Sequence, residues 1–176
     1  VILAIMPWNY PLWQVFRFAI PTLMAGNTAI LKHASNVSGC ALEIERLFQE
    51  AEFPPHVFQT VLMNSKKTEY LLSDNRIKAV SLTGSTPAGQ SVASLAGRYL
   101  KKSVLELGGS DPYIVFDDAD MELAVDLCVK ARMGNTGQTC IAGKRFIVSE
   151  KIYDTFKIKF VEKLKHYKIG NPLEEQ

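Results

Sequence analysis

Residues 77–107, IKAVSLTGSTPAGQSVASLAGRYLKKSVLEL, hold two short β-rich runs separated by a helical pattern. The first run covers residues 77–82, the amphipathic stretch covers 87–96, and the second run covers 103–107. Two parallel strands cannot be joined by a tight hairpin, so this alternation favours a strand, a crossover helix and a second, parallel strand. The segment therefore predicts an α/β fold.

The same alternation extends back to the start of the chain. Further β-rich runs predict strands at residues 2–6, 28–31 and 57–62. Helical patterns between them predict helices at residues 12–25, 37–50 and 68–73. Together these elements predict a doubly wound parallel sheet, a fold that gathers functional groups at the carboxyl ends of its strands.

A glycine and proline cluster at residues 108–112 breaks the pattern. We predict one domain over residues 1–107 and the beginning of a second over residues 108–176. The second is expected to contain strands at 113–116 and 145–148, helices at 121–133 and 152–167, and an irregular loop at 134–143. Two strands are too few for an independently stable sheet, and Val1 already lies in a strand-like run, so we expect a fragment of a longer protein.

Composition narrows the classes of protein and of partner. The 176 residues are 47% hydrophobic and 22% charged, values typical of a folded globular chain. Twenty basic and eighteen acidic side chains leave a net charge of +2 without basic blocks, so no nucleic-acid partner is expected. Polar residues and a proline interrupt the most apolar stretch, residues 12–26, so no membrane span is expected either.

The three cysteines differ in their surroundings. They form no close pair, and His33, His56 and His166 are isolated, so we predict no disulfide framework, no metal site and a reducing, cytoplasmic location. Cys40 and Cys128 lie in apolar helical patterns typical of core residues. Cys140 lies in a glycine-rich loop, which can display a nucleophile near backbone N–H groups. An ordinary loop thiol fits that pattern equally well.

Three polar side chains lie at or just after the ends of predicted strands and should emerge at the same edge of the sheet. Glu106 could act as a general base if partial desolvation raised its pKa. Asn9, in the turn at residues 7–11, could donate a hydrogen bond to an oxyanion, and Lys32 could contact a ribose or phosphate. A solvated glutamate, a turn asparagine and a surface lysine are the ordinary alternatives.

The turn at residues 83–89 follows a strand and begins a helix, with Thr86 predicted as the N-cap and Pro87 as the first helical residue. A helix N-terminus on a glycine turn favours phosphate. The phosphate-binding lysine of a P-loop is replaced by Gln90, which argues against a kinase or GTPase, and the glycine spacing also departs from the usual dinucleotide fingerprint. A plain helix cap remains the alternative.

Taken together, these motifs resemble the aldehyde dehydrogenase superfamily, most closely its bacterial succinate-semialdehyde dehydrogenase branch. The matching segments occur in the family's order and extend over essentially the whole chain: Pro7-Trp8-Asn9, Lys32, residues 83–85 with Gly89, residues 106–109 and residues 137–140. The resemblance implies a Rossmann-like dinucleotide-binding domain in the first region and the N-terminal part of a catalytic domain in the second. His33 stands where many relatives carry proline.

The resemblance also implies a mechanism. Cys140 would attack an aldehyde to form a thiohemiacetal whose oxyanion is held by the Asn9 amide and the Cys140 backbone N–H. Hydride would pass to the nicotinamide, and Glu106 would deprotonate the water that hydrolyses the resulting thioester to the acid. An acylating relative would pass the acyl group to coenzyme A instead, and the presence of Glu106 favours hydrolysis.

The implied cofactor contacts are Ile5, Met6, Pro7, Trp8, Lys32, Ser35, Gly84, Ser85, Gly89 and Leu107. Many NAD-preferring relatives carry glutamate three residues after the lysine, where it repels a 2′-phosphate. Ser35 has no such charge, so we expect NADP to be accepted, with NAD as the alternative.

For the substrate, Gln14 and Arg17 are three residues apart on a predicted helix and should share a face. Arg17 could pair with the distal carboxylate of a small aldehyde such as succinic semialdehyde. The resemblance further implies a homo-oligomer. The competing interpretation is an inactive fragment or pseudoenzyme that only binds nucleotide or a partner chain.

Overall fold

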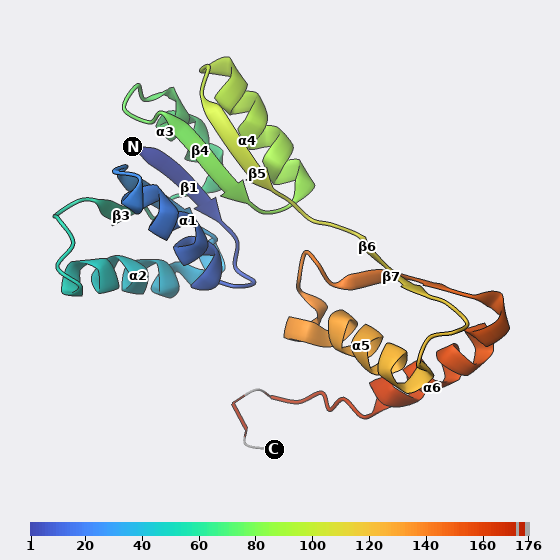
Figure 1. The fold of residues 1–176 in the computed structure, drawn as a ribbon. Coiled ribbons are helices and arrows are strands. Elements are labelled where there is room, and N and C mark those ends of the chain that lie inside the picture. Colours follow the sequence, from blue (N-terminus) through green and yellow to red (C-terminus); the bar gives the residue numbers. More distant parts are fainter. Residues whose placement is uncertain (172, 175–176) are drawn as a thin grey trace. The chain divides into compact units, whose positions relative to one another are not determined.

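The chain folds into two compact units, Val1–Gly108 and Gly109–Gln176, as seen in a computed structural model that describes residues 1–171, 173 and 174 (Figure 1). The first unit contains a five-stranded sheet and the second a two-stranded one. The boundary between the two units lies between Gly108 and Gly109, in the glycine-rich segment that follows the last strand of the larger sheet.

The sheet of the first unit is parallel throughout. Its strands are β1 (Ile2–Met6), β2 (Ala29–His33), β3 (Phe58–Thr60), β4 (Ala79–Thr83) and β5 (Lys102–Glu106). Their order is β3-β2-β1-β4-β5, so the chain winds outward from β1 to one edge and then resumes at β4 on the other side. This confirms the predicted doubly wound fold and puts the reversal of strand order between β1 and β4.

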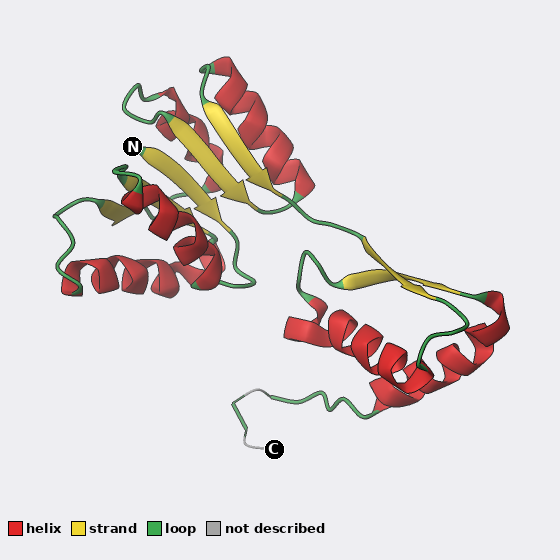
Figure 2. Ribbon diagram, in the orientation of Figure 1, coloured by secondary structure: helices red, strands yellow, loops and turns green. Residues whose placement is uncertain are grey.

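Helices cover both faces of this sheet (Figure 2). They are α1 (Trp13–Met24), α2 (Ser38–Glu50), α3 (Thr68–Ser73) and α4 (Thr86–Arg98), with short 3₁₀ turns η1 (Ser35–Val37) and η2 (Ser65–Lys67). Successive residues of a strand point to opposite faces, so Leu3 packs in the core beneath α3 and α4 while Ala4 packs beneath α1 and α2. Burial on both faces explains why the central strand β1 is continuously apolar, whereas the edge strand β5 carries polar residues and is mostly exposed.

The second unit pairs two parallel strands, β6 (Asp111–Val115) and β7 (Gly143–Val148), with both helices on one face of the pair (Figure 2). The helices are α5 (Met121–Met133) and α6 (Tyr153–Lys165), with 3₁₀ turns η3 (Gly134–Gly137) and η4 (Glu150–Ile152). Its small core consists of Val115, Val125, Cys128, Val129 and Phe156. Among the described helices of the chain, none is both long enough and apolar enough to cross a membrane.

The prediction that Pro112 lies outside regular structure was wrong, because β6 begins at Asp111. The register shifts between Asp111 and Pro112. A proline cannot donate to a strand ladder, but it is tolerated near a strand start or at such an irregularity. The strand therefore starts inside the cluster that interrupts the sequence pattern.

The predicted beginning of α4 was also wrong by one residue. Ser85, not Thr86, is the N-cap: its backbone is extended, with φ −76° and ψ 155°, and its side chain accepts a hydrogen bond from the Ala88 N–H at 3.3 Å. Thr86 is already helical, which moves Pro87 to the second helical position. Both hydroxyl residues suit an N-cap, so the sequence alone did not separate them.

Candidate functional site

The carboxyl ends of four strands form one edge of the larger sheet. Met6 of β1 pairs with His33 of β2, and Thr83 of β4 pairs with Glu106 of β5. Ile5 is in register with Leu82, so β1 and β4 end at nearly the same level. Asn9 and Gly84 thus follow two of these parallel strands, Glu106 ends a third, and Lys32 is the next-to-last residue of β2. Cys140 belongs to the second unit.

A histidine links the two ends of the loop that carries Asn9. His33 is 5% exposed; its Nε2 lies 2.9 Å from the Pro11 carbonyl and its Nδ1 lies 3.1 Å from the Met6 carbonyl. The Ala34 N–H also reaches Nδ1, at 3.0 Å. A neutral ring that donates from Nε2 to Pro11 and accepts at Nδ1 from Ala34 satisfies both nitrogens. His33, which stands where many relatives carry proline, therefore braces the turn after β1.

Lys32 lies beneath the surface beside a pocket of about 320 Å³. It is 8% exposed, and its ammonium donates to the His33 carbonyl at 3.2 Å. Burial lowers the pKa of Lys32, because an ammonium loses hydration there. Ile5 and Leu82 line the same pocket, as does Lys66 of η2, which the sequence analysis did not identify. Ser35, by contrast, is exposed on η1 and its carbonyl accepts from the Ser38 hydroxyl at 2.9 Å.

The glycine turn after β4 is held against β5. The Gly84 N–H donates to the Glu106 carbonyl at 2.9 Å. Gly89, in the first turns of α4, faces Leu107 so closely that a Cβ at residue 89 would lie 2.5 Å from Leu107 Cδ2. Gly89 is therefore needed for close packing rather than for an unusual backbone angle. This contact positions Leu107 directly after the strand that ends in Glu106.

Two predicted site residues of the first unit contact each other. Arg17 Nη2 lies 3.4 Å from Glu106 Oε1, and both side chains are about half exposed, at 47% and 54%. The expected desolvation of Glu106 is therefore not seen, because solvent and a guanidinium both reach it. Gln14 and Arg17 do not present a common open face either. Gln14 is buried, and its Oε1 has no hydrogen-bond partner among the described residues.

Cys140 lies in an unusual loop that follows α5. Asn135 and Thr136 have left-handed backbones, with φ of 50° and 57°, and Gly137 continues at 75°. A Cβ on Gly137 would come within 3.0 Å of the Arg132 carbonyl oxygen, so glycine is required by both conformation and space. The chain thereby reverses sharply between the end of α5 and the half-buried Cys140.

Two cations that the sequence analysis missed hold this loop. Arg132, in the last turn of α5, donates to the Gly137 carbonyl at 2.9 Å and to the Gly143 carbonyl at 3.2 Å. Lys144 donates to the Cys140 carbonyl at 3.0 Å. Neither residue belongs to a recognisable motif, because each acts by reaching backbone carbonyls that only the folded loop brings together.

The other two thiols have different surroundings. Cys128 is 3% exposed in the small core, and burial raises the pKa of its thiol, as expected of a core cysteine. Cys40 is half-buried on α2. Among the described residues, no group of three or more histidine, cysteine, aspartate or glutamate side chains could hold a metal ion.

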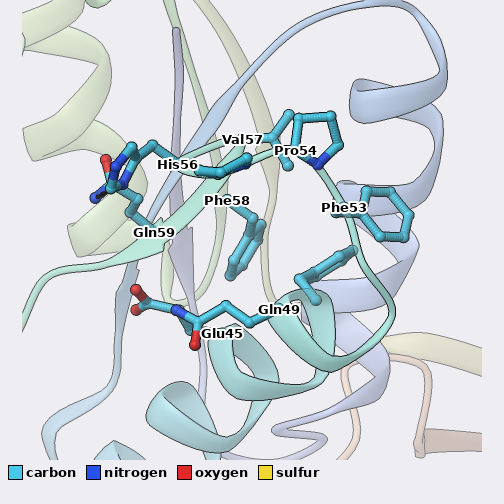
Figure 3. A pocket seen from close by; sticks show the side chains of 10 residues that line it. Glu45, Gln49, Phe53, Pro54, His56, Val57, Phe58 and Gln59 are labelled. Carbon is cyan, nitrogen blue, oxygen red and sulfur yellow. Dashed lines mark hydrogen bonds between the residues drawn. The ribbon is translucent and has the colours of Figure 1, made fainter.

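A second, much smaller hollow lies between α2 and the segment leading into β3 (Figure 3). Its volume is about 30 Å³, and the stacked rings of Phe48 and Phe58, 4.6 Å apart, form part of its wall. Glu45 accepts a hydrogen bond from the Thr60 N–H at 2.7 Å. Such a volume has room for only a few water molecules, so this hollow is a packing feature.

Comparison with known proteins identifies the family of the chain. The sequence matches the model of the aldehyde dehydrogenase family over residues 1–176. The chain belongs to this family. The likeness inferred from the motifs is thereby confirmed at the level of the family.

Similar proteins include one from Synechocystis sp. that is named a probable NADP(+) succinate-semialdehyde dehydrogenase. It is 55% identical to this chain over 172 residues. A Mycobacterium avium protein named as an NADP(+) succinate-semialdehyde dehydrogenase is 57% identical over 172 residues. The alignments cover 98% of this chain but 38% and 36% of those proteins. The chain thus spans less than two fifths of each.

Solved structures of the family agree in fold. A succinic semialdehyde dehydrogenase from Streptococcus pyogenes in complex with NADP+ gives a TM-score of 0.95 at 39% identity, covering 98% of this chain and 38% of that one. A lactaldehyde dehydrogenase from Escherichia coli also gives 0.95, at 35% identity, covering 99% of this chain and 37% of that one. Family members with different named substrates therefore match this chain equally well in fold.

Proposed function

We propose that this chain is the nucleotide-binding and thiol-bearing part of an NADP-dependent aldehyde dehydrogenase that oxidises a small semialdehyde, succinic semialdehyde being the expected substrate. The proposal rests chiefly on one observation: the family match spans the whole chain, including a cysteine in a loop clamped by Arg132 and Lys144. The names of the Synechocystis and Mycobacterium relatives support the choice of aldehyde and cofactor.

In the proposed reaction, the Cys140 sulfur adds to the aldehyde carbon, and the Asn9 amide and the Cys140 N–H donate hydrogen bonds to the oxyanion. Bound NADP would supply the hydride acceptor. Glu106 then takes a proton from the water that attacks the thioester, so that the acid leaves and the thiol is regenerated.

The pairing of Arg17 with Glu106 suggests how a charged substrate would be recognised. The guanidinium is half exposed and lies 3.4 Å from a Glu106 carboxylate oxygen, so a substrate carboxylate can compete for it. Bidentate pairing with a carboxylate is the geometry that arginine favours. Binding a semialdehyde through its distal carboxylate would then free Glu106 from Arg17.

Steady-state rates of the natural protein that carries this sequence test the proposal. We expect succinic semialdehyde to exceed glutaric semialdehyde and an uncharged aldehyde in kcat/KM, with NADP preferred to NAD. Arg17→Gln should abolish the preference for the charged aldehydes. Preference of the native protein for the uncharged aldehyde would contradict the role of Arg17, and absence of any aldehyde oxidation would favour the inactive alternative.

Assembly and location belong to the same proposal. Free cysteines without a disulfide fit a reducing compartment such as the cytoplasm. A homo-oligomer is expected from the family resemblance, and sedimentation of the natural protein would measure its mass directly. A monomer at micromolar concentration would contradict that part of the proposal.

A further inference from the structure

His33 is a buried polar side chain to which the family resemblance assigns no role. It ends β2, and many relatives carry proline at this position, a side chain that cannot form hydrogen bonds. Burying an imidazole costs free energy unless its nitrogens find partners. The partners of His33 therefore indicate what this residue does.

The two ring nitrogens of His33 reach opposite ends of the loop that carries Asn9. At one end, the Ala34 nitrogen lies 3.0 Å from His33 Nδ1 and 3.0 Å from the Met6 carbonyl oxygen, so its N–H is shared between them. At the other end, Nε2 of the neutral ring donates to the Pro11 carbonyl at 2.9 Å. One side chain of β2 thus sets the spacing between the end of β1 and Pro11.

The start of α1 is held by His33 rather than by a side-chain cap. Leu12 occupies the N-cap position and has no polar group with which to cap the helix. The Tyr10 carbonyl accepts from the Gln14 N–H at 3.0 Å, within the first turn. The next carbonyl, that of Pro11, is the one that accepts from His33. The junction between the loop and α1 is therefore tied to β2 through the imidazole.

We propose that His33 is a positioning residue for Asn9: by fixing the spacing between the two ends of the loop, it keeps the Asn9 amide where it can donate to the oxyanion. The inference rests on the proposed function and adds one residue to it. Asn9 lies three residues after Met6 and two before Pro11. In so short a segment, a shift at either end has to be taken up by the backbone around Asn9, because the proline ring of Pro7 fixes φ at residue 7.

The expected kinetic effect follows from when the oxyanion exists. It forms only once the carbonyl has been attacked, so a misplaced donor should lower kcat and kcat/KM about equally. Removing an oxyanion donor altogether costs about 100- to 1,000-fold in kcat. Loosening the Asn9 amide through His33 should cost about tenfold, the order expected for one hydrogen bond.

Two polar substitutions in the natural protein distinguish the two ring nitrogens. In His33→Gln the side-chain amide can extend to the Nε2 position and donate to Pro11, whereas in His33→Asn it extends only as far as Nδ1. With succinic semialdehyde and NADP, His33→Asn should lower kcat about tenfold and His33→Gln less than about threefold. The matched control is His166→Asn, the same change at an exposed histidine of the second unit, which should leave kcat unchanged.

The dissociation constant of NADP is measured by calorimetry in the same variants. It should change less than about twofold, because the Lys32 ammonium donates to the backbone carbonyl of residue 33, which every substitution retains. Amide hydrogen exchange of residues 8–10, followed by mass spectrometry, should be about tenfold faster in His33→Asn and unchanged in His166→Asn.

A double-mutant cycle with Asn9→Ala shows whether His33 acts through Asn9. His33→Asn should cost about tenfold in kcat when Asn9 is present and less than about twofold when Asn9→Ala has already removed the donor. His33→Ser, which lacks both ring nitrogens, should behave as His33→Asn does and replaces it in the cycle if His33→Asn does not fold.

The outcomes separate this inference from the proposed function. If the native protein oxidises the aldehyde but His33→Asn costs as much with Asn9→Ala as without it, only the inference is overturned. The same holds if His33→Gln loses as much kcat as His33→Asn, or if the loss lies in the binding of NADP. If the native protein oxidises no aldehyde, the proposed function fails and this inference fails with it.

Discussion

Two glycines of α4 show how differently the same residue can be constrained. Gly89 lies against Leu107, where an added methyl group would come within 2.5 Å of Cδ2. Gly97 is in the same helix, and a Cβ there would meet nothing within 4 Å. The sequence does not reveal this difference in packing: Gly89 lies inside the predicted amphipathic stretch at residues 87–96, and Gly97 directly follows it.

We therefore expect opposite effects from replacing each glycine with alanine. Gly89→Ala makes the same gain in helix propensity as Gly97→Ala but must push the Leu107 side chain aside, so on balance it should lower the free energy of unfolding by up to about 2 kcal/mol. Gly97→Ala should raise it by about 0.5–1 kcal/mol, since alanine restricts the unfolded chain and favours the helix. Urea titrations of the two variants measure both changes. Equal effects would show that Leu107 does not pack on Gly89 as described.

What the sequence could predict at this scale depended on whether a residue's role is local. Glu106 ends β5 and Asn9 lies in the turn after β1, as the alternating pattern predicted. The predicted strand ended before Lys32, whereas β2 continues through this buried residue to His33. Arg132 and Lys66 were missed, since the carbonyls and the pocket they reach are formed by distant segments. The pairing of Arg17 with Glu106 was missed for the same reason.

At the scale of single elements, the beginning of α4 offers a direct test of the structure against the sequence pattern. Ser85 caps the helix, whereas the pattern favoured Thr86. Ser85→Ala should cost about 1 kcal/mol of unfolding free energy, because the Ala88 N–H loses its partner. Thr86→Ala should change stability by less than about 0.5 kcal/mol, since Thr86 is exposed and already helical. Chemical denaturation distinguishes the two, and a larger loss from Thr86→Ala would restore the original assignment.

The packing of α5 on α6 should depend on pH through Asp126. Hydrogen bonds first from Lys130 and then from Lys163 lower the pKa of the Asp126 carboxyl, with each ammonium 2.6 Å away. A lowered pKa stabilises the folded state above the unfolded value of about 3.9, and the contribution is lost as the pH falls through the folded pKa. Asp126→Asn should therefore reduce stability at pH 7 but make little difference near pH 2.

The control for that prediction is Asp154→Asn, the same change at an exposed carboxylate in the first turn of α6. Thermal unfolding of both variants at neutral and acidic pH measures the effect. A difference for Asp126→Asn that persisted undiminished at low pH would show that the carboxylate charge is not its cause.

Element boundaries were the least predictable part of the fold. The order of strands and helices followed from the alternating pattern, and the sheet topology agrees with it. The start of β6 did not, because Pro112 is a strand residue only by virtue of its pairing with β7. The N-cap of α4 could also be identified only from the three-dimensional structure, since two adjacent hydroxyl residues, Ser85 and Thr86, are both suited to cap the helix.

At the scale of the whole molecule, the three thiols should differ in reactivity. Cys128 is in the core with a raised pKa, and Cys40 is half-buried on a helix. Cys140 has the loop geometry proposed to display a nucleophile. We expect iodoacetamide to alkylate Cys140 first and Cys128 last in the natural protein, and Cys140→Ser to remove the fast phase. Peptide mapping by mass spectrometry follows each site, and alkylation of Cys140 no faster than Cys40 would contradict its role.

The loop before Cys140 has a consequence for local motion. Thr136 is β-branched yet has a φ of 57°, a conformation that costs such a residue of the order of 1 kcal/mol. The backbone there is kept in place by Arg132 rather than by its own preference. Brief openings that detach the guanidinium should therefore release this segment well before the strands separate, and amide hydrogen exchange around residue 137 should be faster than in β7.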